Sequence, residues 1–130
     1  MAGDSEGRDR TTILVVEDDA AIRDLIRTVL ARFDARLLLA GSAEEAAAAA
    51  AAEPHIDLLL TDVQLPGASG RELATTLRGT HPALRVIYMT GWREHAALDH
   101  VPDAMILNKP FELKELARVV TSALGHDGEA

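Results

Sequence analysis

Short hydrophobic runs alternate with stretches of helical periodicity over most of this chain. Apolar runs closed by turn residues are typical of strands buried on both faces, and apolar residues at helical spacing are typical of a helix with one buried face. The runs predict five strands, at 12–16, 37–40, 56–61, 86–90 and 104–108. The remaining stretches predict helices at 20–33, from Ser42 to before Pro54, at about 69–78 and at 112–124.

This alternation determines the expected fold class. Strands that alternate with helices pair in parallel through right-handed crossovers, so the pattern predicts one α/β domain with a doubly wound sheet. The segment 91–102 leaves room for at most a short helix, because Pro102 interrupts it, and the fourth helix should be abbreviated or irregular. Residues 1–11 and 125–130 are polar and contain glycine, which predicts a disordered lead-in and a flexible tail.

Composition narrows the function classes. The 130 residues are 48% hydrophobic and 26% charged, enough for one domain with a normal core. The net charge of −8 argues against nucleic acid or an anionic membrane as a direct partner, and the absence of cysteine excludes disulfides and thiol chemistry. No apolar run approaches the ~20 residues of a membrane span, and residues 1–10 lack a signal-peptide core, so we expect a cytoplasmic protein.

The most informative segment is LLLTDVQLPGA, at 58–68. It is an apolar run that ends at Asp62 and is followed by Pro66 and Gly67. Asp62 would lie where a buried strand emerges at the carboxyl edge of the sheet, the usual place for ligand chemistry in open α/β folds. On this segment alone a second interpretation is equally good, namely that Asp62 opens a turn.

Polar groups also end the other central strands. Glu17, Asp18 and Asp19 follow the first strand, Thr90 ends the fourth, and Lys109 follows the fifth. In a parallel sheet these ends converge on one edge. Clustered carboxylates repel one another unless a hard cation such as Mg²⁺ neutralises them, lysine supplies a charge for an anion, and an aspartate can attack phosphorus.

Each of these residues also has an ordinary interpretation. Asp19 is a good helix N-cap, the favoured role for that residue. A threonine at a strand end is common strand composition, and Lys109-Pro110 is a common loop dipeptide. Their joint occurrence on successive strand ends favours a functional site.

Four motifs together resemble the receiver domain of bacterial two-component response regulators. They are ILVVEDD at 13–19, LLLTDVQLPGASG at 58–70, VIYMTGW at 86–92 and LNKPF at 107–111, and the resemblance covers 12–124. It implies a flavodoxin-like, five-stranded parallel sheet with strand order 2-1-3-4-5. It also implies that Asp62 accepts a phosphoryl group, with Mg²⁺, from a histidine kinase or a histidine phosphotransfer protein.

The resemblance assigns further roles by position. Asp18 matches a direct magnesium ligand, Glu17 an acidic partner acting through water, and the main-chain carbonyl of Gln64 a third protein ligand beside Asp62. Thr90 matches a switch hydroxyl and Lys109 the cation that pairs with the phosphoryl group. Pro110 matches a position preceded by a cis peptide bond.

The sequence departs from the family pattern at Ile106, at Trp92 and in the stretch between Thr90 and Lys109, which is shorter than typical. Ile106 stands where the family usually has an aromatic residue that swings inward on activation, and we interpret it as a core residue. Gln64 and Trp92 match positions that tune acyl-phosphate lifetime. The Trp92 indole either screens the phosphoryl group from water or covers a neighbouring helix. The short 91–102 segment falls on the face that most family members use for output.

The leading hypothesis is therefore a stand-alone phosphoacceptor switch that signals to an unknown downstream protein by protein–protein contact, without a DNA-binding module. A receiver module of a hybrid histidine kinase is a related alternative. A phosphohydrolase with an aspartyl nucleophile is a different class, disfavoured because Gln64 stands where the general acid is expected. A degenerate receiver is disfavoured because the site residues are competent. None of the five histidines is expected to bind metal or carry phosphate.

Overall fold

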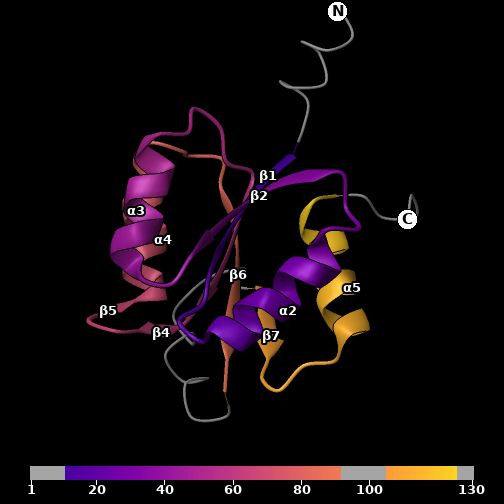
Figure 1. Cartoon of the computed structure of the whole chain (residues 1–130). Coiled ribbons are helices and arrows are strands. Elements are labelled where there is room, and N and C mark those ends of the chain that lie inside the picture. The colour runs from indigo at the N-terminus through magenta and orange to yellow at the C-terminus, as the bar shows by residue number, and fades with distance from the viewer. Residues whose placement is uncertain (1–10, 92–104, 126–130) are drawn as a thin grey trace, which may run out of the picture.

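In the computed structural model, which describes residues 11–91 and 105–125, a five-stranded parallel sheet is covered by helices on both faces (Figure 1). Its strands are β1 (Thr11–Val16), β2 (Ala35–Ala40), β3 (Leu58–Asp62), β6 (Arg85–Thr90) and β7 (Met105–Asn108). They lie in the order β2-β1-β3-β6-β7, and every adjacent pair is parallel. In chain order this is 2-1-3-4-5, so the predicted doubly wound, flavodoxin-like topology is confirmed.

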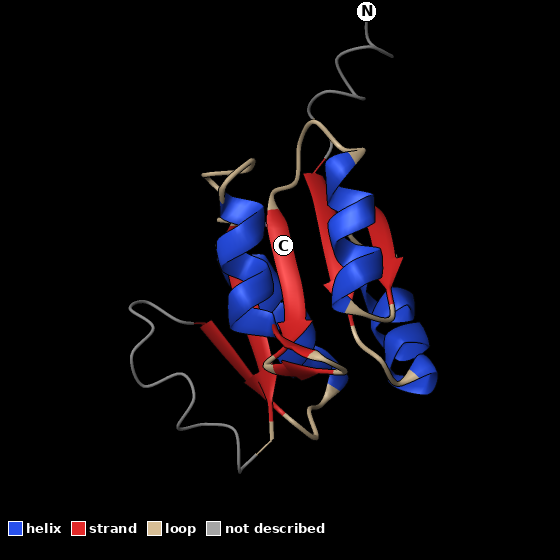
Figure 2. Ribbon diagram, turned by 90° about the vertical axis from the view of Figure 1, so that its left-hand side faces the viewer, coloured by secondary structure: helices blue, strands red, loops and turns tan. Residues whose placement is uncertain are grey.

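Helices lie on both faces of the sheet (Figures 1 and 2). On each face a cluster of hydrophobic side chains packs between the helices and the sheet. The described helices are α2 (Ala20–Leu30), α3 (Ala43–Ala51), α4 (Gly70–Arg78) and α5 (Leu113–Ala123). Alternate residues of β1 serve opposite layers: Leu14 and Val16 join the α3 and α4 side, and Ile13 and Val15 join the α2 and α5 side. The central strands are consequently buried on both faces, as their continuous apolar runs predict.

Side-chain caps fix where three helices begin. Asp19 accepts hydrogen bonds from the backbone N–H groups of Ala21 and Ile22, which confirms its predicted role as the N-cap of α2. Ser42 caps α3 by accepting from the Glu45 N–H, and Ser69 caps α4 in the same way. In an ideal capping box the Glu45 carboxylate would accept from the N–H of the N-cap residue, Ser42. Here it accepts from the N–H of Gly41, one residue earlier.

The structure corrects several predicted boundaries. Helix α2 ends at Leu30, not Phe33, because the next residues form a tighter turn in which the Phe33 N–H donates to the Leu30 carbonyl. Strand β3 begins at Leu58, since Asp57 turns its carboxylate to the Thr12 N–H. Strand β1 already includes Thr11, which the sequence assigns to the lead-in.

A two-stranded ribbon of β4 (Gln64–Leu65) and β5 (Ala68–Ser69) was not predicted. It encloses Gly67, whose φ of 73° is readily adopted by glycine. The predicted abbreviated fourth helix falls on residues 92–104, and most of the predicted lead-in and tail falls on 1–10 and 126–130. All three segments lie outside the described residues. Within the described part of the chain, no helix has the length and apolar character needed to cross a membrane.

Candidate functional site

The carboxyl edge of the sheet brings the predicted site residues together. Asp62 is the last residue of β3, Thr90 the last of β6, and Glu17 and Lys109 directly follow β1 and β7. The parallel register sets Asp62 opposite Met89 and Thr90 opposite Asn108, so the strand ends are level. A further bond from the Lys109 N–H to the Thr90 carbonyl, of 2.9 Å, extends the pairing of β6 and β7 into the site.

Lys109 joins two carboxylates. Its Nζ lies 2.7 Å from Asp62 Oδ1 and 2.8 Å from Glu17 Oε1. The Glu17 and Asp62 side chains are 1% and 7% exposed, whereas that of Lys109 is 26% exposed. The ammonium therefore compensates two buried negative charges, each of which would be costly without a partner.

Glu17 is held at every polar group. Its N–H donates to the Ala40 carbonyl at 3.0 Å, and its own carbonyl accepts from Arg23 Nη1 at 2.7 Å. Oε2 accepts from the Asp19 N–H at 3.0 Å, while Oε1 accepts from Lys109. Both carboxylate oxygens are thus engaged within the protein, which agrees with an outer rather than a direct role toward a metal.

Glu17, Asp18 and Asp62 form a group that fits a divalent cation. One carboxylate oxygen from each residue lies within 4.8 Å of the others. Glu17 and Asp62 are buried, whereas Asp18 is exposed and accessible. Hard cations such as Mg²⁺ take oxygen ligands of this kind and usually retain several waters, so the donor set suits Mg²⁺. Asp18, Asp62 and Gln64 also line one pocket of about 220 Å³, together with Met89, Gly91 and Lys109.

Burial shapes the acid–base properties of the site. It raises the pKa of Asp62 from 3.8 to about 7, with the nearby Glu17 charge adding to the rise and Lys109 opposing it. For Lys109, burial alone would lower the pKa, but the contacts with Asp62 and Glu17 outweigh it, and the pKa is raised. Burial therefore disfavours the ionised form of Asp62 despite the contact with Lys109, and a metal cation at the site would stabilise that form.

The backbone around Asp62 is closely packed. The Val63 N–H donates to the Met89 carbonyl, and the Gly70 N–H donates to the Val63 carbonyl at 2.7 Å. A Cβ atom at position 70 would stand 2.0 Å from the Asp62 carbonyl oxygen, so only glycine fits there. Gly70 supports the site from the first residue of α4.

The other predicted site residues fall in different settings. Thr90 is 1% exposed, and its hydroxyl donates to the Gly91 carbonyl at 2.9 Å. Ile106 pairs with Tyr88 across β6 and β7 and packs, partly buried, against the core cluster on the α3 and α4 side. The Lys109–Pro110 peptide bond is cis. Trp92 lies outside the described residues.

Sequence reasoning missed Arg23 and Gly70 as contributors to the site. Gly70 is the eighth residue after Asp62, but nothing in the sequence shows how near its Cα comes to the Asp62 carbonyl. Arg23 belongs to the polar face of α2, where an arginine ordinarily faces solvent. Of the histidines, His81 is buried and contacts the Thr80 hydroxyl and the Glu53 carbonyl, away from the acidic group.

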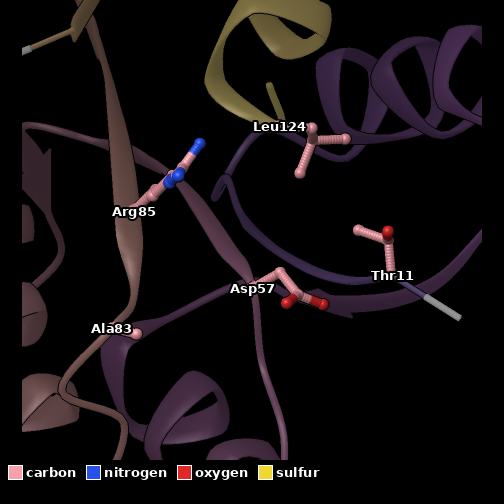
Figure 3. Close-up of a pocket in the computed structure, with 5 residues that line it drawn as sticks. All are labelled: Thr11, Asp57, Ala83, Arg85 and Leu124. Atoms are coloured by element: carbon pink, nitrogen blue, oxygen red, sulfur yellow. The ribbon is translucent and has the colours of Figure 1, made fainter. Parts of the chain in front are cut away.

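A second pocket, of about 250 Å³, opens at the opposite edge of the sheet (Figure 3). Its lining residues are at or near the amino ends of strands or at the end of α5: Thr11, Asp57, Ala83, Arg85 and Leu124. Asp57 accepts from the Thr12 N–H, and Arg85 donates to the Ala123 carbonyl at the end of α5. These polar groups are used to join elements of the fold.

Comparison with known proteins identifies the family of this chain. The family model of the response regulator receiver domain matches residues 13–121. The transcriptional regulator NtrC of Azospirillum brasilense is 34% identical over 122 residues, covering 87% of this chain and 24% of the regulator. The sensor kinase CckA of Brucella abortus is 33% identical over 117 residues, covering 87% of this chain and 12% of the kinase. The chain thus spans a quarter or less of these relatives.

Solved structures agree with the sequence matches. A response regulator receiver domain protein from Clostridium thermocellum superposes with a TM-score of 0.78 at 26% identity, covering 89% of this chain and 95% of that one. A receiver protein from Sinorhizobium medicae superposes with a TM-score of 0.79 at 26% identity, covering 91% and 97%. The fold, the matched residues and the acidic edge lead to one assignment: the chain belongs to the receiver domain family of two-component response regulators.

Proposed function

We propose that this receiver accepts a phosphoryl group on Asp62 and works as a phosphorylation switch. The observation that carries the proposal is the contact of 2.7 Å between Asp62 Oδ1 and Lys109 Nζ beside Glu17 and Asp18. Asp62, Lys109 and Asp18 line a pocket, where an anionic group can enter. Membership of the receiver family supports the same chemistry.

The donor is a phosphohistidine of a histidine kinase or a histidine phosphotransfer protein. An Asp62 carboxylate oxygen attacks phosphorus, forming a P–O bond while the P–N bond to the imidazole breaks. The bonding electron pair leaves with the imidazole nitrogen, which takes up a proton. The product is an acyl phosphate on Asp62 and a free histidine on the donor.

Asp18, the Asp62 carboxylate and the Gln64 carbonyl would hold Mg²⁺, with Glu17 acting through water. When bound, Mg²⁺ neutralises charge on the phosphoryl oxygens. Lys109 is already at Asp62 and can move its ammonium to a phosphoryl oxygen without leaving the site. If the Lys109 ammonium moves away from Glu17, the bound Mg²⁺ would compensate the negative charge of Glu17.

The switch would pass through Thr90. The Thr90 hydroxyl, which donates to the Gly91 carbonyl, would turn to donate to a phosphoryl oxygen and so break this contact. Because Ile106 replaces the usual aromatic residue, the response here does not use an aromatic rotamer change at that position. Gln64 borders the pocket and would tune the lifetime of the acyl phosphate, as would Trp92.

We assign output to protein–protein contact. The net charge of −8 disfavours direct binding of nucleic acid. The matched relatives include both a transcriptional regulator and a sensor kinase, and this chain matches only a part of each, so a receiver module of a hybrid kinase is the alternative context.

A phosphorylation assay tests the proposal. Acetyl phosphate with Mg²⁺, or a phosphorylated histidine donor, should add one phosphoryl group that hydroxylamine removes. Asp62→Asn should not be labelled, whereas Asp57→Asn, at the opposite edge of the sheet, should be labelled like the wild type. Beryllofluoride with Mg²⁺ should shift NMR signals around Thr90. Unchanged labelling of Asp62→Asn would refute the assignment.

A further inference from the structure

Arg23 connects helix α2 to the acidic group at the sheet edge. It lies in the first turns of α2, and its Nη1 donates to the Glu17 carbonyl at 2.7 Å. That carbonyl belongs to the peptide unit between Glu17 and Asp18. We infer that Arg23 is a positioning residue for the cation site, acting through this peptide unit, and that Gly41 provides the space for it. The inference rests on the proposed binding of Mg²⁺.

The contact bears on Asp18 because its neighbour is already fixed. Glu17 is anchored through its N–H to Ala40 and through its carboxylate to Lys109 and the Asp19 N–H. Arg23 fixes the remaining polar group of Glu17, its carbonyl, and with it the plane of the following peptide unit. Asp18 leaves that plane with an exposed side chain, so the direction of its carboxylate depends on how the peptide is held.

Gly41 lies next to the Arg23 guanidinium. It directly follows β2, next to the Ala40 carbonyl that binds Glu17. A Cβ on Gly41 would stand 3.0 Å from Arg23 Nη1 and 3.8 Å from its Cζ. The 3.0 Å contact is tighter than ordinary packing and would push Arg23 Nη1 by a few tenths of an ångström, whereas 3.8 Å is an ordinary contact. The absence of a side chain at position 41 therefore leaves Arg23 undisturbed in the position from which it donates to the Glu17 carbonyl.

Charge and position predict opposite effects for Arg23. A cationic side chain next to a cation site repels the incoming ion, so loss of its charge alone would tighten Mg²⁺ binding. If Arg23 mainly holds the peptide before Asp18, its loss weakens Mg²⁺ binding, because the ligand is no longer oriented. Whether the affinity for Mg²⁺ falls or rises in Arg23→Ala therefore distinguishes the two roles, provided that every variant is folded in the assay.

The experiment is a double-mutant cycle on Arg23 and Gly41, with the dissociation constant of Mg²⁺ measured by calorimetry or NMR titration. Arg23→Ala should bind Mg²⁺ about tenfold more weakly, the scale at which partners of metal ligands act. Gly41→Ala should weaken binding in the same direction while keeping every charge. In the double variant the glycine substitution should add little, because both changes act through one contact. Arg23→Lys, which keeps a donor and the charge, should fall between Arg23→Ala and wild type.

Arg27→Ala is the matched control. Arg27 lies one turn further along α2, is exposed and pairs with Asp24 on the same helix, so its loss should leave Mg²⁺ affinity unchanged. In metal-free protein, the amide signals of Asp18 and Asp19 should shift in Arg23→Ala but not in Arg27→Ala. If wild type binds Mg²⁺ and Arg23→Ala binds it as tightly or more tightly, the inference is wrong. If wild type itself does not bind Mg²⁺, the proposed metal site is wrong and the inference falls with it.

Discussion

Gly70 lies against the backbone of Asp62 so closely that a single added carbon would stand 2.0 Å from the Asp62 carbonyl oxygen. The same Cβ would be 3.1 Å from Thr61 Cγ2. Because the nearest atom is main chain of a buried strand, no side-chain rotation can relieve the overlap. Helix α4 can therefore begin at this place only with glycine.

Gly70→Ala should lower the free energy of unfolding by about 1–3 kcal/mol or more, because overpacked sites usually cost that amount. Urea denaturation followed by circular dichroism measures it. Gly79→Ala, at the other end of α4, is a matched comparison because its nearest atom would be 3.1 Å away, and it should cost less. Equal effects of the two substitutions would contradict the packing argument.

Lys109→Gln should destabilise the metal-free protein at neutral pH. It leaves the buried Glu17 and Asp62 carboxylates without their shared cation, and breaking a buried ion pair costs about 3 kcal/mol. Denaturant unfolding at pH 7, with EDTA present, checks this. Lys114→Gln, an exposed lysine of α5, should change stability by less than about 0.5 kcal/mol.

Stability should also depend on pH through Asp62. Its pKa is raised from 3.8 to about 7 by burial, so the folded protein binds the Asp62 proton more tightly than the unfolded chain does. The resulting stabilisation is complete below pH 3.8 and is lost as the pH rises toward about 7, with little further change above. Unfolding of wild type and Asp62→Asn in EDTA across this range measures it, since the variant lacks this contribution. Parallel curves for the two proteins would contradict the raised pKa.

Arg85→Met should act on the fold and not on the site. Arg85 donates to the Ala123 carbonyl at the last turn of α5, at the edge of the sheet opposite Asp62. Losing this contact to the helix C-terminus should cost about 1 kcal/mol of unfolding free energy. Phosphorylation of Asp62 by acetyl phosphate should proceed at the wild-type rate. A marked loss of phosphorylation in the folded variant would indicate coupling between the two edges.

The topology was predictable because buried parallel strands and amphipathic helices leave different periodicities. The limits of the elements were less predictable. Phe33 fits the apolar face of α2 and does pack into the core, yet it reaches the core from a turn that follows the helix. Ile56 is buried like a strand residue but precedes β3, since Asp57 binds the Thr12 N–H.

The candidate site was predictable where chemistry lies in the residue type. Asp62, Glu17, Asp18, Thr90 and Lys109 stand out because polar residues end apolar strands. Arg23 and Gly70 do not stand out, because their contribution is a contact with main-chain atoms. Such contacts arise only in the folded chain, where the Arg23 guanidinium reaches a carbonyl and Gly70 has no room for a side chain.

The order of the strands along the chain also has a consequence during synthesis. Glu17 and Asp62 are synthesised well before Lys109, the cation that lies between them. A ribosome-bound chain that ends at β6 contains both acids but not the lysine that contacts them, and the three side chains meet only after β7 has joined the edge of the sheet. The two carboxylates therefore gain their compensating charge last, when the strand that ends the sheet order is added.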